Sequence, residues 1–414
     1  MAAKVIHIIG GGTVSHVRNH LALAAPAYGT TARQLYEILE GSMMERRLHL
    51  TKMAGGMKLE TNEDIAALLK TLTADPATKI IFMNAALVDF YGAIGFEKSD
   101  KHAERLHSRE GSADMMLFPK PKLLKTIREK RKDIFLVAFK TTTGATEDEQ
   151  YIAGLTLLKE ASCNLVLAND VVTRKNMIIV PEEARYHVTD NRYTVLQQLV
   201  EMTLLRSHLT FTRSTVVAGE PVAWESEIVP AALRTVVNHC ISRDAYKPFH
   251  GATVGHFACK INDTTFLTST RRSNFNDLAK NGLVRVETDG PDSVIAYGSK
   301  PSVGGQSQRI VFNDHQEYDC IVHFHCPKRD GSEVPTISQR EYECGSHECG
   351  RNTSRGLKKF GNLSAVYLDE HGPNVVFHHT IDPQEVISFI EANFDLSGKT
   401  GGYVSLGPIL SESK

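Results

Sequence analysis

Three histidines have the residue type and spacing that could hold a metal ion. His323 and His325 lie two residues apart in the apolar run 320–325, and His371 follows a second apolar run at 365–368. Because alternate residues of a β-strand point to the same face, the first two imidazoles can aim at one point. Three imidazoles with one open position form the ligand set of a catalytic zinc site, although single histidines are more often solvated or hydrogen-bonded. The sequence therefore predicts a site for Zn²⁺, or for another divalent metal, at His323, His325 and His371.

A second cluster of metal-ligating residues competes with this site. Cys344, His347 and Cys349 lie within six residues of one another. They could bind zinc themselves, add ligands to the histidine site, or form a polar loop with two buried, unreactive thiols. His378 and His379 follow a strand-like run. They are expected to be exposed, or to contact metal ligands without binding the metal themselves.

Length and composition limit the classes of protein that this chain can be. At 414 residues the chain is too long for one hydrophobic core, so two or three domains are expected. The apolar share of 42% and the charged share of 23% are typical of globular proteins. The 47 basic and 48 acidic residues nearly cancel, so no bulk field favours nucleic acid or an anionic membrane.

The distribution of apolar residues and cysteines predicts a cytoplasmic location. No apolar run reaches the roughly 18 residues that a membrane-spanning helix needs. The N-terminus enters a strand-like run at once, which leaves no room for a signal peptide. The seven cysteines are odd in number and scattered, so they do not indicate a disulfide framework. We expect a reduced, cytoplasmic protein with small-molecule substrates and with neither nucleic acid nor membrane as a partner.

The first half of the chain has the pattern of alternating β-strands and α-helices. Short apolar runs alternate with amphipathic stretches, as in a parallel sheet with crossover helices. Thr61 or Asn62 is the expected N-cap of the first of these helices. This pattern predicts a Rossmann-like, doubly wound α/β fold, whose ligands bind at the carboxyl ends of the strands. The expected strands are 5–9, 79–83, 134–139, 164–168 and 177–180, and the expected helices are 62–71, 123–130, 149–161 and 193–204.

The ends of the predicted strands carry residues that could bind a nucleotide. A glycine-rich segment follows the first strand and would let backbone amides approach a phosphate before a helix. It lacks the G-x-G-x-x-G spacing of dinucleotide sites, and a tight strand-to-helix turn is the alternative. The carboxylate at position 89 could hold a ribose or an ammonium group. The candidate nucleotide-binding residues are Gly10, Gly11, Gly12, Thr13, Ala85, Ala86, Asp89, Phe139, Lys140, Asn169 and Asp170.

Sequence motifs follow one another at 11–13 with 17–18, and at 85–90, 121–124, 135–141 and 167–171. Taken in order, they resemble phosphopantothenoylcysteine synthetase, the ligase of coenzyme A biosynthesis, over about residues 4–203. The resemblance implies a Rossmann-like, usually dimeric domain that binds ATP or CTP with Mg²⁺. In that family the nucleotide activates the carboxylate of 4′-phosphopantothenate as an acyl-nucleotidylate, which the amine of cysteine then attacks.

Two positions depart from the pattern of that family. The family's asparagine that grips the acyl intermediate aligns with Ala22, in a segment that begins at Asn19. The family's lysine that stabilises the activated acyl group aligns with Arg105, whose planar guanidinium is not equivalent to a point charge. Asn19 and Arg105 are therefore candidate catalytic residues. These departures affect the expected pantothenate substrate more than the expected nucleotide binding. A ligase that acts on another carboxylate is therefore an alternative.

The second half has its own organisation. The pattern of the first half breaks at 206–226, which predicts a linker between domains at 1–205 and 227–414. A helical stretch, 228–242, then gives way to strand-like runs at 266–270, 283–286 and 320–323. We expect an α/β domain with a central, mostly antiparallel sheet.

Five segments of this half follow one another in order, at 255–258, 268–270, 300–302, 323–325 and 370–372. Together they resemble the class II aldolase/adducin family over about residues 226–395. The resemblance implies a zinc or similar ion on the three histidines. It also implies a pocket for a phosphate or another anionic substrate, lined by Gly255, Thr268, Ser269 and Ser302.

The resemblance implies carbonyl chemistry but leaves the base open. A metal ion would polarise a carbonyl so that the adjacent carbon can carry negative charge. The family takes its base from a glutamate at the position of Gly304, and its asparagine next to Gly255 is His256 here. Glu287 and Glu370 are other candidates for the base, unless no proton is abstracted.

These features together predict a bifunctional enzyme. One half would be a nucleotide-dependent acid–amine ligase, and the other a metal-dependent lyase or epimerase. Since both families build sites at subunit contacts, a homo-oligomer is expected. The alternative is a divergent paralogue in which one half has lost catalysis and serves binding or assembly, as adducin-like proteins do.

Overall fold

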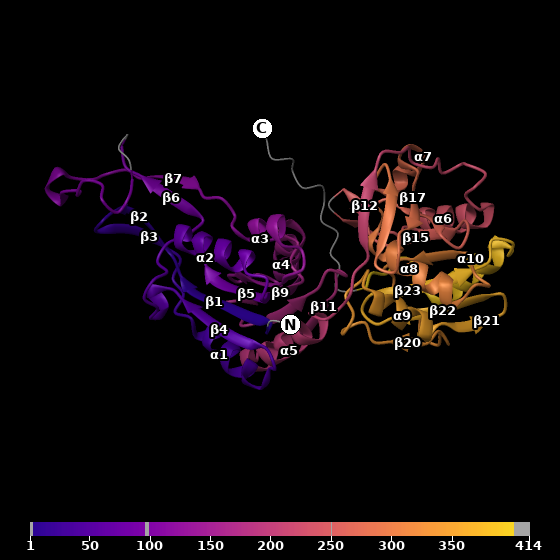
Figure 1. The fold of residues 1–414 in the computed structure, drawn as a ribbon, viewed down its shortest axis with the longest axis horizontal. Helices are drawn as coiled ribbons and strands as arrows, with labels where there is room; N and C mark the ends of the chain where they lie inside the picture. The colour runs from indigo at the N-terminus through magenta and orange to yellow at the C-terminus, as the bar shows by residue number, and fades with distance from the viewer. Residues whose placement is uncertain (1–2, 96–98, 250, 401–414) are drawn as a thin grey trace. The chain divides into compact units, whose positions relative to one another are not determined.

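The computed structural model describes residues 3–95, 99–249 and 251–400. The chain forms two compact units (Figure 1). The first comprises Met1–Pro181 and Tyr186–Ser207, and the second comprises Glu182–Arg185 and His208–Lys414. The four residues at 182–185 thus belong to the second unit, although their neighbours in the chain belong to the first. Within the described ranges, every helix is too short or too polar to cross a membrane.

The first unit is built on a seven-stranded sheet in the order β11-β10-β9-β8-β5-β1-β4. Neighbouring strands from β9 to β4 are parallel, and β10 is antiparallel to β9. All five predicted strands are present, which confirms the doubly wound fold. Strand β4 was not predicted because charged residues interrupt its apolar ones. The strands are β1 (Val5–Gly12), β4 (Glu45–Leu50), β5 (Thr78–Ala86), β8 (Phe135–Thr142), β9 (Leu165–Asp170), β10 (Asn176–Ile179) and β11 (Arg185–Thr189).

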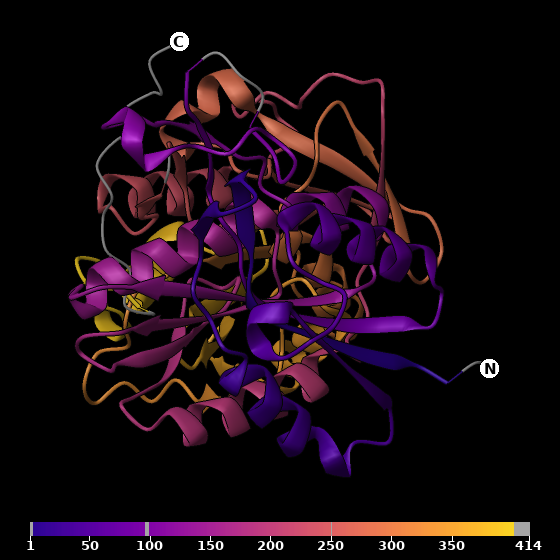
Figure 2. The same ribbon diagram turned by 90° about the vertical axis from the view of Figure 1, so that its left-hand side faces the viewer.

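Helices cover both faces of this sheet. Helices α2, α3 and α4 lie on one face and α1 and α5 on the other (Figures 1 and 2). Thr61 is the N-cap of α2, since its hydroxyl accepts from the Asp64 amide while the Asp64 carboxylate accepts from the Thr61 amide. The helices are α1 (Thr30–Ile38), α2 (Asn62–Ala74), α3 (Leu124–Lys130), α4 (Glu147–Ala161) and α5 (Arg192–Arg206).

Two hairpins of the first unit lie outside its main sheet. They are β2 (Val14–Arg18) with β3 (Leu21–Ala24), and β6 (Phe90–Ala93) with β7 (Met116–Pro119). The first hairpin corrects one expectation, because β2 follows the glycine-rich segment directly and α1 begins only at Thr30. The expected strand-to-helix turn is therefore absent at that place.

The second unit is built on a ten-stranded sheet in the order β12-β18-β17-β16-β15-β19-β23-β22-β20, with β21 paired to β22. All neighbours are antiparallel except the parallel pairs β12–β18 and β20–β22. The expected mostly antiparallel sheet is confirmed. The strands are β12 (Arg213–Val217), β15 (His256–Lys260), β16 (Thr265–Ser269), β17 (Leu283–Thr288), β18 (Ser293–Tyr297), β19 (Cys320–His323), β20 (Thr336–Ile337), β21 (Lys358–Phe360), β22 (Leu363–Leu368) and β23 (Gly372–Phe377), beside the short pair β13 (Pro248–Phe249) and β14 (Ala252–Thr253).

The two faces of this sheet pack against different helices. Phe257 and Val322 join the core that includes α6 (Ala231–Ser242) and α10 (Pro383–Asn393). Their chain neighbours, Ala258 and Ile321, join a second core with α8 (Val303–Asp314). Since strand residues alternate, the face that carries Ala258 and Ile321 also carries His256 and His323. Helix α9 (His347–Gly356) packs beside α8, and the short α7 (Leu278–Asn281) precedes β17.

Most of the stretch 206–226, expected as a linker, belongs to the second unit, which includes the chain from His208 onward. Strand β12 pairs with β18 along its whole length. Trp224 is 3% exposed and packs edge-on against Phe257, with 5.5 Å between ring centroids. Strand β12 was not predicted, because every one of its residues is exposed and its sequence shows no apolar alternation.

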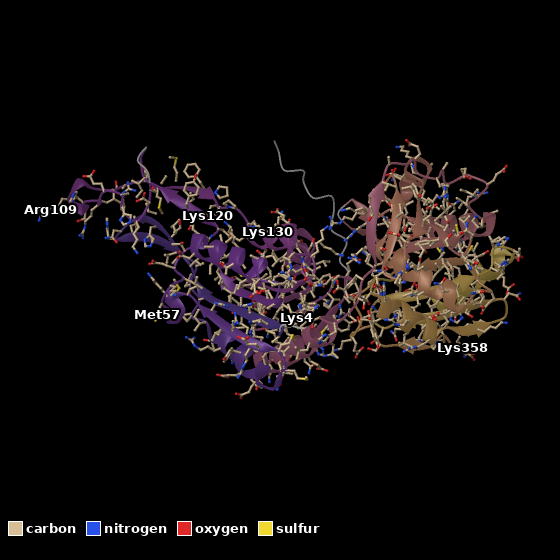
Figure 3. The ribbon with its side chains drawn as sticks, viewed as in Figure 1. Lys4, Met57, Arg109, Lys120, Lys130 and Lys358 are labelled. Atoms are coloured by element: carbon tan, nitrogen blue, oxygen red, sulfur yellow. The ribbon has the colours of Figure 1, made fainter. Side chains whose placement is uncertain are left out.

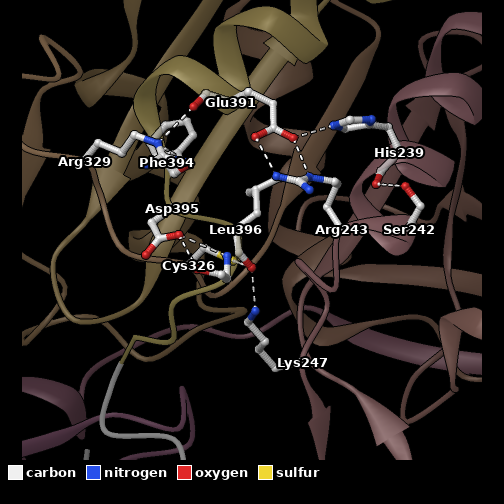
Figure 4. A network of polar contacts seen from close by, with 11 residues as sticks. His239, Ser242, Arg243, Lys247, Cys326, Arg329, Glu391, Phe394, Asp395 and Leu396 are labelled. Atoms are coloured by element: carbon white, nitrogen blue, oxygen red, sulfur yellow. Dashed lines mark hydrogen bonds and ion pairs between the residues drawn. The ribbon is translucent and has the colours of Figure 1, made fainter.

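A polar network holds α6 against α10 (Figure 4). Glu391 on α10 lies 2.9 Å from His239 Nε2 and accepts a 2.8 Å hydrogen bond from Arg243 Nε. Nearby, Cys326 Sγ donates to the carbonyl oxygen of Ala245 at 3.4 Å. Cys326 directly follows the histidine pair, so this contact anchors the end of the segment that carries it.

Candidate metal centre

The three predicted histidines converge in the second unit. His323 ends β19, His325 follows it, and His371 lies in the tight connection between β22 and β23. The exposed fractions of these residues are 1%, 7% and 2%. One ring nitrogen from each lies within 4.8 Å of the others. The ring centroids are 4.5 to 5.1 Å apart.

The hairpin that carries His371 lies close to the histidine pair because of a glycine. A Cβ added to Gly372 would lie 2.2 Å from the carbonyl oxygen of Phe324. The same turn contains Glu370 in the left-handed region (φ 56°) and is closed by a hydrogen bond from the His371 amide to Leu368. A side chain at position 372 would therefore push His371 away from the other two rings.

Hydrogen bonding leaves a lone pair of His323 available at the centre of the cluster. His323 Nδ1 lies 2.8 Å from the carbonyl oxygen of Pro373, which can only accept, so Nδ1 carries the proton. His323 Nε2 lies 3.2 Å from His371 Nε2. Two nitrogens about 2.0–2.1 Å from a tetrahedral zinc ion are about 3.3 Å apart. The spacing of these two nitrogens fits a shared cation.

Burial keeps His323 in the form that binds metals. It lowers the pKa of His323 to about 4. Neutral imidazole is the ligand form of histidine. His323 therefore presents an uncharged ring nitrogen at neutral pH.

A buried carboxylate, which the sequence did not reveal, supports one of the three rings. Glu183 Oε2 lies 3.5 Å from His325 Nδ1, and each side chain is 9% exposed. Glu183 also has a backbone in the left-handed region (φ 62°), which is uncommon for a residue with a side chain. A carboxylate on the outer nitrogen of a metal-binding histidine orients the ring and strengthens it as a ligand. No local pattern could predict this contact, since the partners are distant in sequence.

A fourth imidazole adjoins the cluster. His256 on β15 is the cross-strand partner of His323, with 4.7 Å between ring centroids. It is 6% exposed, and burial lowers its pKa well below the usual range, with further lowering by His323 and His325. A Cβ added to Gly304 would lie 2.3 Å from His256 Cε1. The two positions that depart from the aldolase pattern are therefore in contact, and the imidazole occupies the space into which a side chain at 304 would project.

The residues expected to form an anion pocket make contacts within the fold, but the buried Ser269 hydroxyl has no hydrogen-bond partner among the described residues. The Thr268 hydroxyl donates to the carbonyl oxygen of Phe257 at 3.2 Å. The Ser302 amide donates to the Ser269 carbonyl, and a Cβ on Gly255 would lie 2.6 Å from the His323 carbonyl oxygen. The cavity that adjoins His323 and His371 is lined by His256, Ser307, Gln308, Val311, His323, Cys344, Cys349, Gly350, Thr353, Leu368, His371 and Asn374.

The candidate bases differ in position. The Glu287 carboxylate accepts hydrogen bonds from Tyr297 (2.7 Å) and Arg285 (2.5 Å) on β18 and β17, and it does not line the cavity. Glu370 immediately precedes His371, and burial together with Asp369 raises its pKa. Of these two carboxylates, Glu370 is therefore nearer in sequence to a predicted metal ligand.

The cysteine–histidine cluster does not form a metal site of its own. His347 Nε2 lies 2.8 Å from the Thr212 hydroxyl, and its Nδ1 lies 3.5 Å from an Asp292 carboxylate oxygen. Cys344 and Cys349 share a hydrogen bond with each other and line the cavity beside the histidines. Within the described ranges, the groups of three or more that could hold a metal are the predicted histidines and a partly exposed set, Asp319 with His378 and His379.

The glycine-rich segment of the first unit serves close packing. A Cβ on Gly10 would lie 2.2 Å from Ala32 Cβ of α1, and one on Gly12 would lie 2.1 Å from the Ala25 carbonyl oxygen. The Thr13 hydroxyl donates to Asn62 Oδ1 at 2.7 Å. Gly11 and Gly12 pair with Ala85 and Ala86 of β5. Packing alone therefore accounts for glycine at positions 10 and 12.

Asp170 also has a structural role. Its carboxylate accepts from the Gly144, Ala145, Val172 and Thr173 amides at 2.8 to 3.0 Å. Burial opposes ionisation, but these hydrogen bonds hold the pKa of Asp170 well below its usual range. The carboxylate joins two loops at the carboxyl ends of β8 and β9.

The remaining candidates of the first unit are more accessible. Asp89 is exposed and pairs with Lys122 at 2.5 Å. Phe139 and Lys140 are half-buried on β8, and Asn169 on β9 accepts a 3.4 Å hydrogen bond from Thr141. Asn19 and Arg105 are exposed, and Figure 3 places Arg109, just beyond Arg105, at the tip of an extension of this unit.

Comparisons with known proteins give structural matches of two kinds. No family model and no curated protein matches the chain. The DNA/pantothenate metabolism flavoprotein from Streptococcus pneumoniae is 18% identical, with a TM-score of 0.42, over 48% of this chain and 97% of its own. The C-terminal domain of the coenzyme A biosynthesis bifunctional protein CoaBC is 16% identical, with a TM-score of 0.37, over 49% of this chain and 95% of its own. L-fuculose 1-phosphate aldolase is 15% identical, with a TM-score of 0.32, over 40% of this chain and 83% of its own. These are the two kinds of protein that the sequence motifs resemble.

Proposed function

We propose that the second unit is a metal-dependent enzyme domain that acts on a carbonyl compound, by lyase or epimerase chemistry. The observation that carries this proposal is the convergence of three buried imidazoles, His323, His325 and His371, with ring nitrogens within 4.8 Å of one another. Their number and type fit Zn²⁺, with manganese and iron as further possibilities.

The residues of this chain would prepare the site in three ways. The Pro373 carbonyl fixes the proton of His323 on Nδ1, and the Glu183 carboxylate lies 3.5 Å from Nδ1 of His325. Burial keeps His323 neutral. A divalent ion bound there supplies a Lewis acid that polarises a carbonyl oxygen.

The metal content of the purified protein tests this proposal. We expect about one zinc ion per chain in the wild type and loss of that zinc in His323→Ala. His239→Ala is a matched control, because His239 contacts Glu391 on α10 and contributes no ligand. Wild-type protein that stays metal-free after incubation with zinc, manganese or ferrous iron would refute the proposal.

For the first unit we propose a nucleotide-dependent ligase that binds ATP or CTP with Mg²⁺ and joins a carboxylate to an amine. The order of its sequence motifs supports this proposal, and its doubly wound sheet offers the usual place for a nucleotide. Packing explains part of the glycine-rich segment, so binding must be measured directly. We expect ATP or CTP to raise the melting temperature of this unit, and nucleoside monophosphate to form with 4′-phosphopantothenate and cysteine. Nucleotide binding without turnover of 4′-phosphopantothenate and cysteine would indicate that the substrate is another carboxylate. Absence of nucleotide binding would favour a divergent paralogue in which this half has lost catalysis.

We also propose that the chain forms a homo-oligomer. The β6–β7 hairpin exposes several large apolar side chains, namely Phe90, Tyr91, Met115, Met116, Leu117 and Phe118. An apolar patch of this kind on a projecting ribbon is typical of a protein interface. Light scattering should give more than one chain per particle, and Phe118→Asp should reduce that number. A monomeric wild type would refute this proposal.

A further inference from the structure

A small, partly open cavity is lined by two of the three predicted metal ligands, His323 and His371. Its volume is about 10 Å³, which is close to the smallest space that holds one water molecule. His256 and His323 from the sheet line one side, and Gln308 of α8 and Thr353 of α9 line the other. The space therefore admits about one non-hydrogen atom next to these candidate metal ligands, and it is far too small for a whole phosphate group.

Gln308 has unused hydrogen-bonding capacity at this cavity. Its side chain is buried, at 2% exposure, and neither the amide nitrogen nor the amide oxygen has a hydrogen-bond partner among the described residues. Buried amides without partners are rare, because desolvating them is unfavourable. An amide presents a donor and an acceptor together, which suits a hydroxyl or carbonyl oxygen. The cavity is where such an oxygen would sit.

His256 and Gly304 determine the size of this space. The absence of a side chain at Gly304 lets the His256 ring lie against the start of α8, since a Cβ there would be 2.3 Å from Cε1 and 2.5 Å from Nδ1. The ring is also held beside His323 by the pairing of β15 with β19. It therefore forms a wall that limits what can enter between the sheet and α8.

We propose that this cavity receives one oxygen of a compact, unphosphorylated substrate, that Gln308 binds that oxygen, and that His256 excludes larger groups. The substrate class is a small hydroxy- or oxo-compound, and not a sugar phosphate. This inference rests on the proposed metal-dependent function, and it assigns specificity to residues outside the ligand set.

Cobalt provides a test that does not depend on knowing the substrate. Cobalt(II) replaces zinc in such sites and has visible absorption bands that change when a small anion binds. We expect azide to change the spectrum of the cobalt-loaded wild type, whereas inorganic phosphate at the same concentration does not. Gln308→Leu should weaken azide binding at least about tenfold, the value of one hydrogen bond to a charged ligand, with cobalt affinity unchanged within about threefold. Gln308→Met serves if the leucine variant does not fold, and Gln316→Leu, at an exposed position, should match the wild type.

The second variant tests the wall. His256→Ala opens a space of about one imidazole ring, so phosphate and free imidazole should now change the cobalt spectrum. Equal azide affinity in the wild type and the Gln308 variants, or phosphate binding to the wild type as tightly as azide, would overturn the inference while the metal site stands. Failure of the wild type to take up cobalt would overturn the proposed function and the inference with it.

Discussion

Glu183→Gln should weaken zinc binding without removing any ligand. The carboxylate lies 3.5 Å from His325 Nδ1, and both side chains are 9% exposed, so solvent screens this contact little. Loss of a carboxylate behind a metal-bound histidine typically costs 10- to 100-fold in metal affinity, or about 1.4 to 2.7 kcal/mol. The separation exceeds an ideal hydrogen bond, and glutamine can still accept from the ring. We therefore expect a value near the lower end, about tenfold, and a larger loss for Glu183→Ala.

Competition between the protein and a chromophoric zinc chelator measures this change. Glu182→Gln is the matched control, because this neighbouring carboxylate accepts from the Cys344 amide at 2.5 Å. The control should change zinc affinity less than about threefold. If Glu183→Gln binds zinc as tightly as the wild type, or if both variants lose affinity equally, then Glu183 does not orient His325.

Three further predictions concern stability. Gly304→Ala should lower the free energy of unfolding in urea by about 1–3 kcal/mol, because the added Cβ would overlap the His256 ring. Adding His256→Ala to this variant should restore most of the lost stability. An unchanged urea midpoint in Gly304→Ala would contradict the contact. Asp170→Asn should lower the unfolding midpoint at pH 7, and the loss should shrink gradually as pH falls below about 4, the ordinary pKa of aspartate. The folded pKa of Asp170 lies far below that value, so the wild type loses the stability of this ionised carboxyl only gradually over that range. An effect of equal size at all pH values would be the contrary result. Burial, and to a lesser extent His49, lowers the pKa of His7 to about 4. The unfolded state therefore binds more protons than the folded state between pH 6.5 and 4, and the wild type should lose stability as pH falls through this range. The free energy of unfolding of His7→Asn, followed by circular dichroism, should depend less steeply on pH, and identical slopes in the two proteins would refute the assignment.

The elements with strong apolar patterns could be predicted from the sequence. Strand β1 is buried at all eight positions, and its first five residues form an apolar run that only His7 interrupts. Helix α2 shows both its apolar face and its capping residue, Thr61. The three histidines could be predicted because strand periodicity and an apolar setting are local properties.

Contacts between residues distant in sequence could not be predicted in this way. Glu183 reaches His325 from a short segment that belongs to the second unit, and nothing near it in sequence indicates a metal site. The contact of His256 with Gly304 depends on how α8 packs against β15. Strand β12 lacks buried residues, so it resembled a linker. In each case the missing information was tertiary packing.

The metal centre itself is tested most directly by X-ray absorption at the zinc edge of the purified, zinc-loaded protein. The account predicts three imidazole nitrogens at about 2.0–2.1 Å and one further light atom, with the imidazole signal reduced in His371→Ala. Sulfur at about 2.3 Å, which would indicate Cys344 or Cys349 as ligands, or zinc with fewer than three imidazoles, would contradict it.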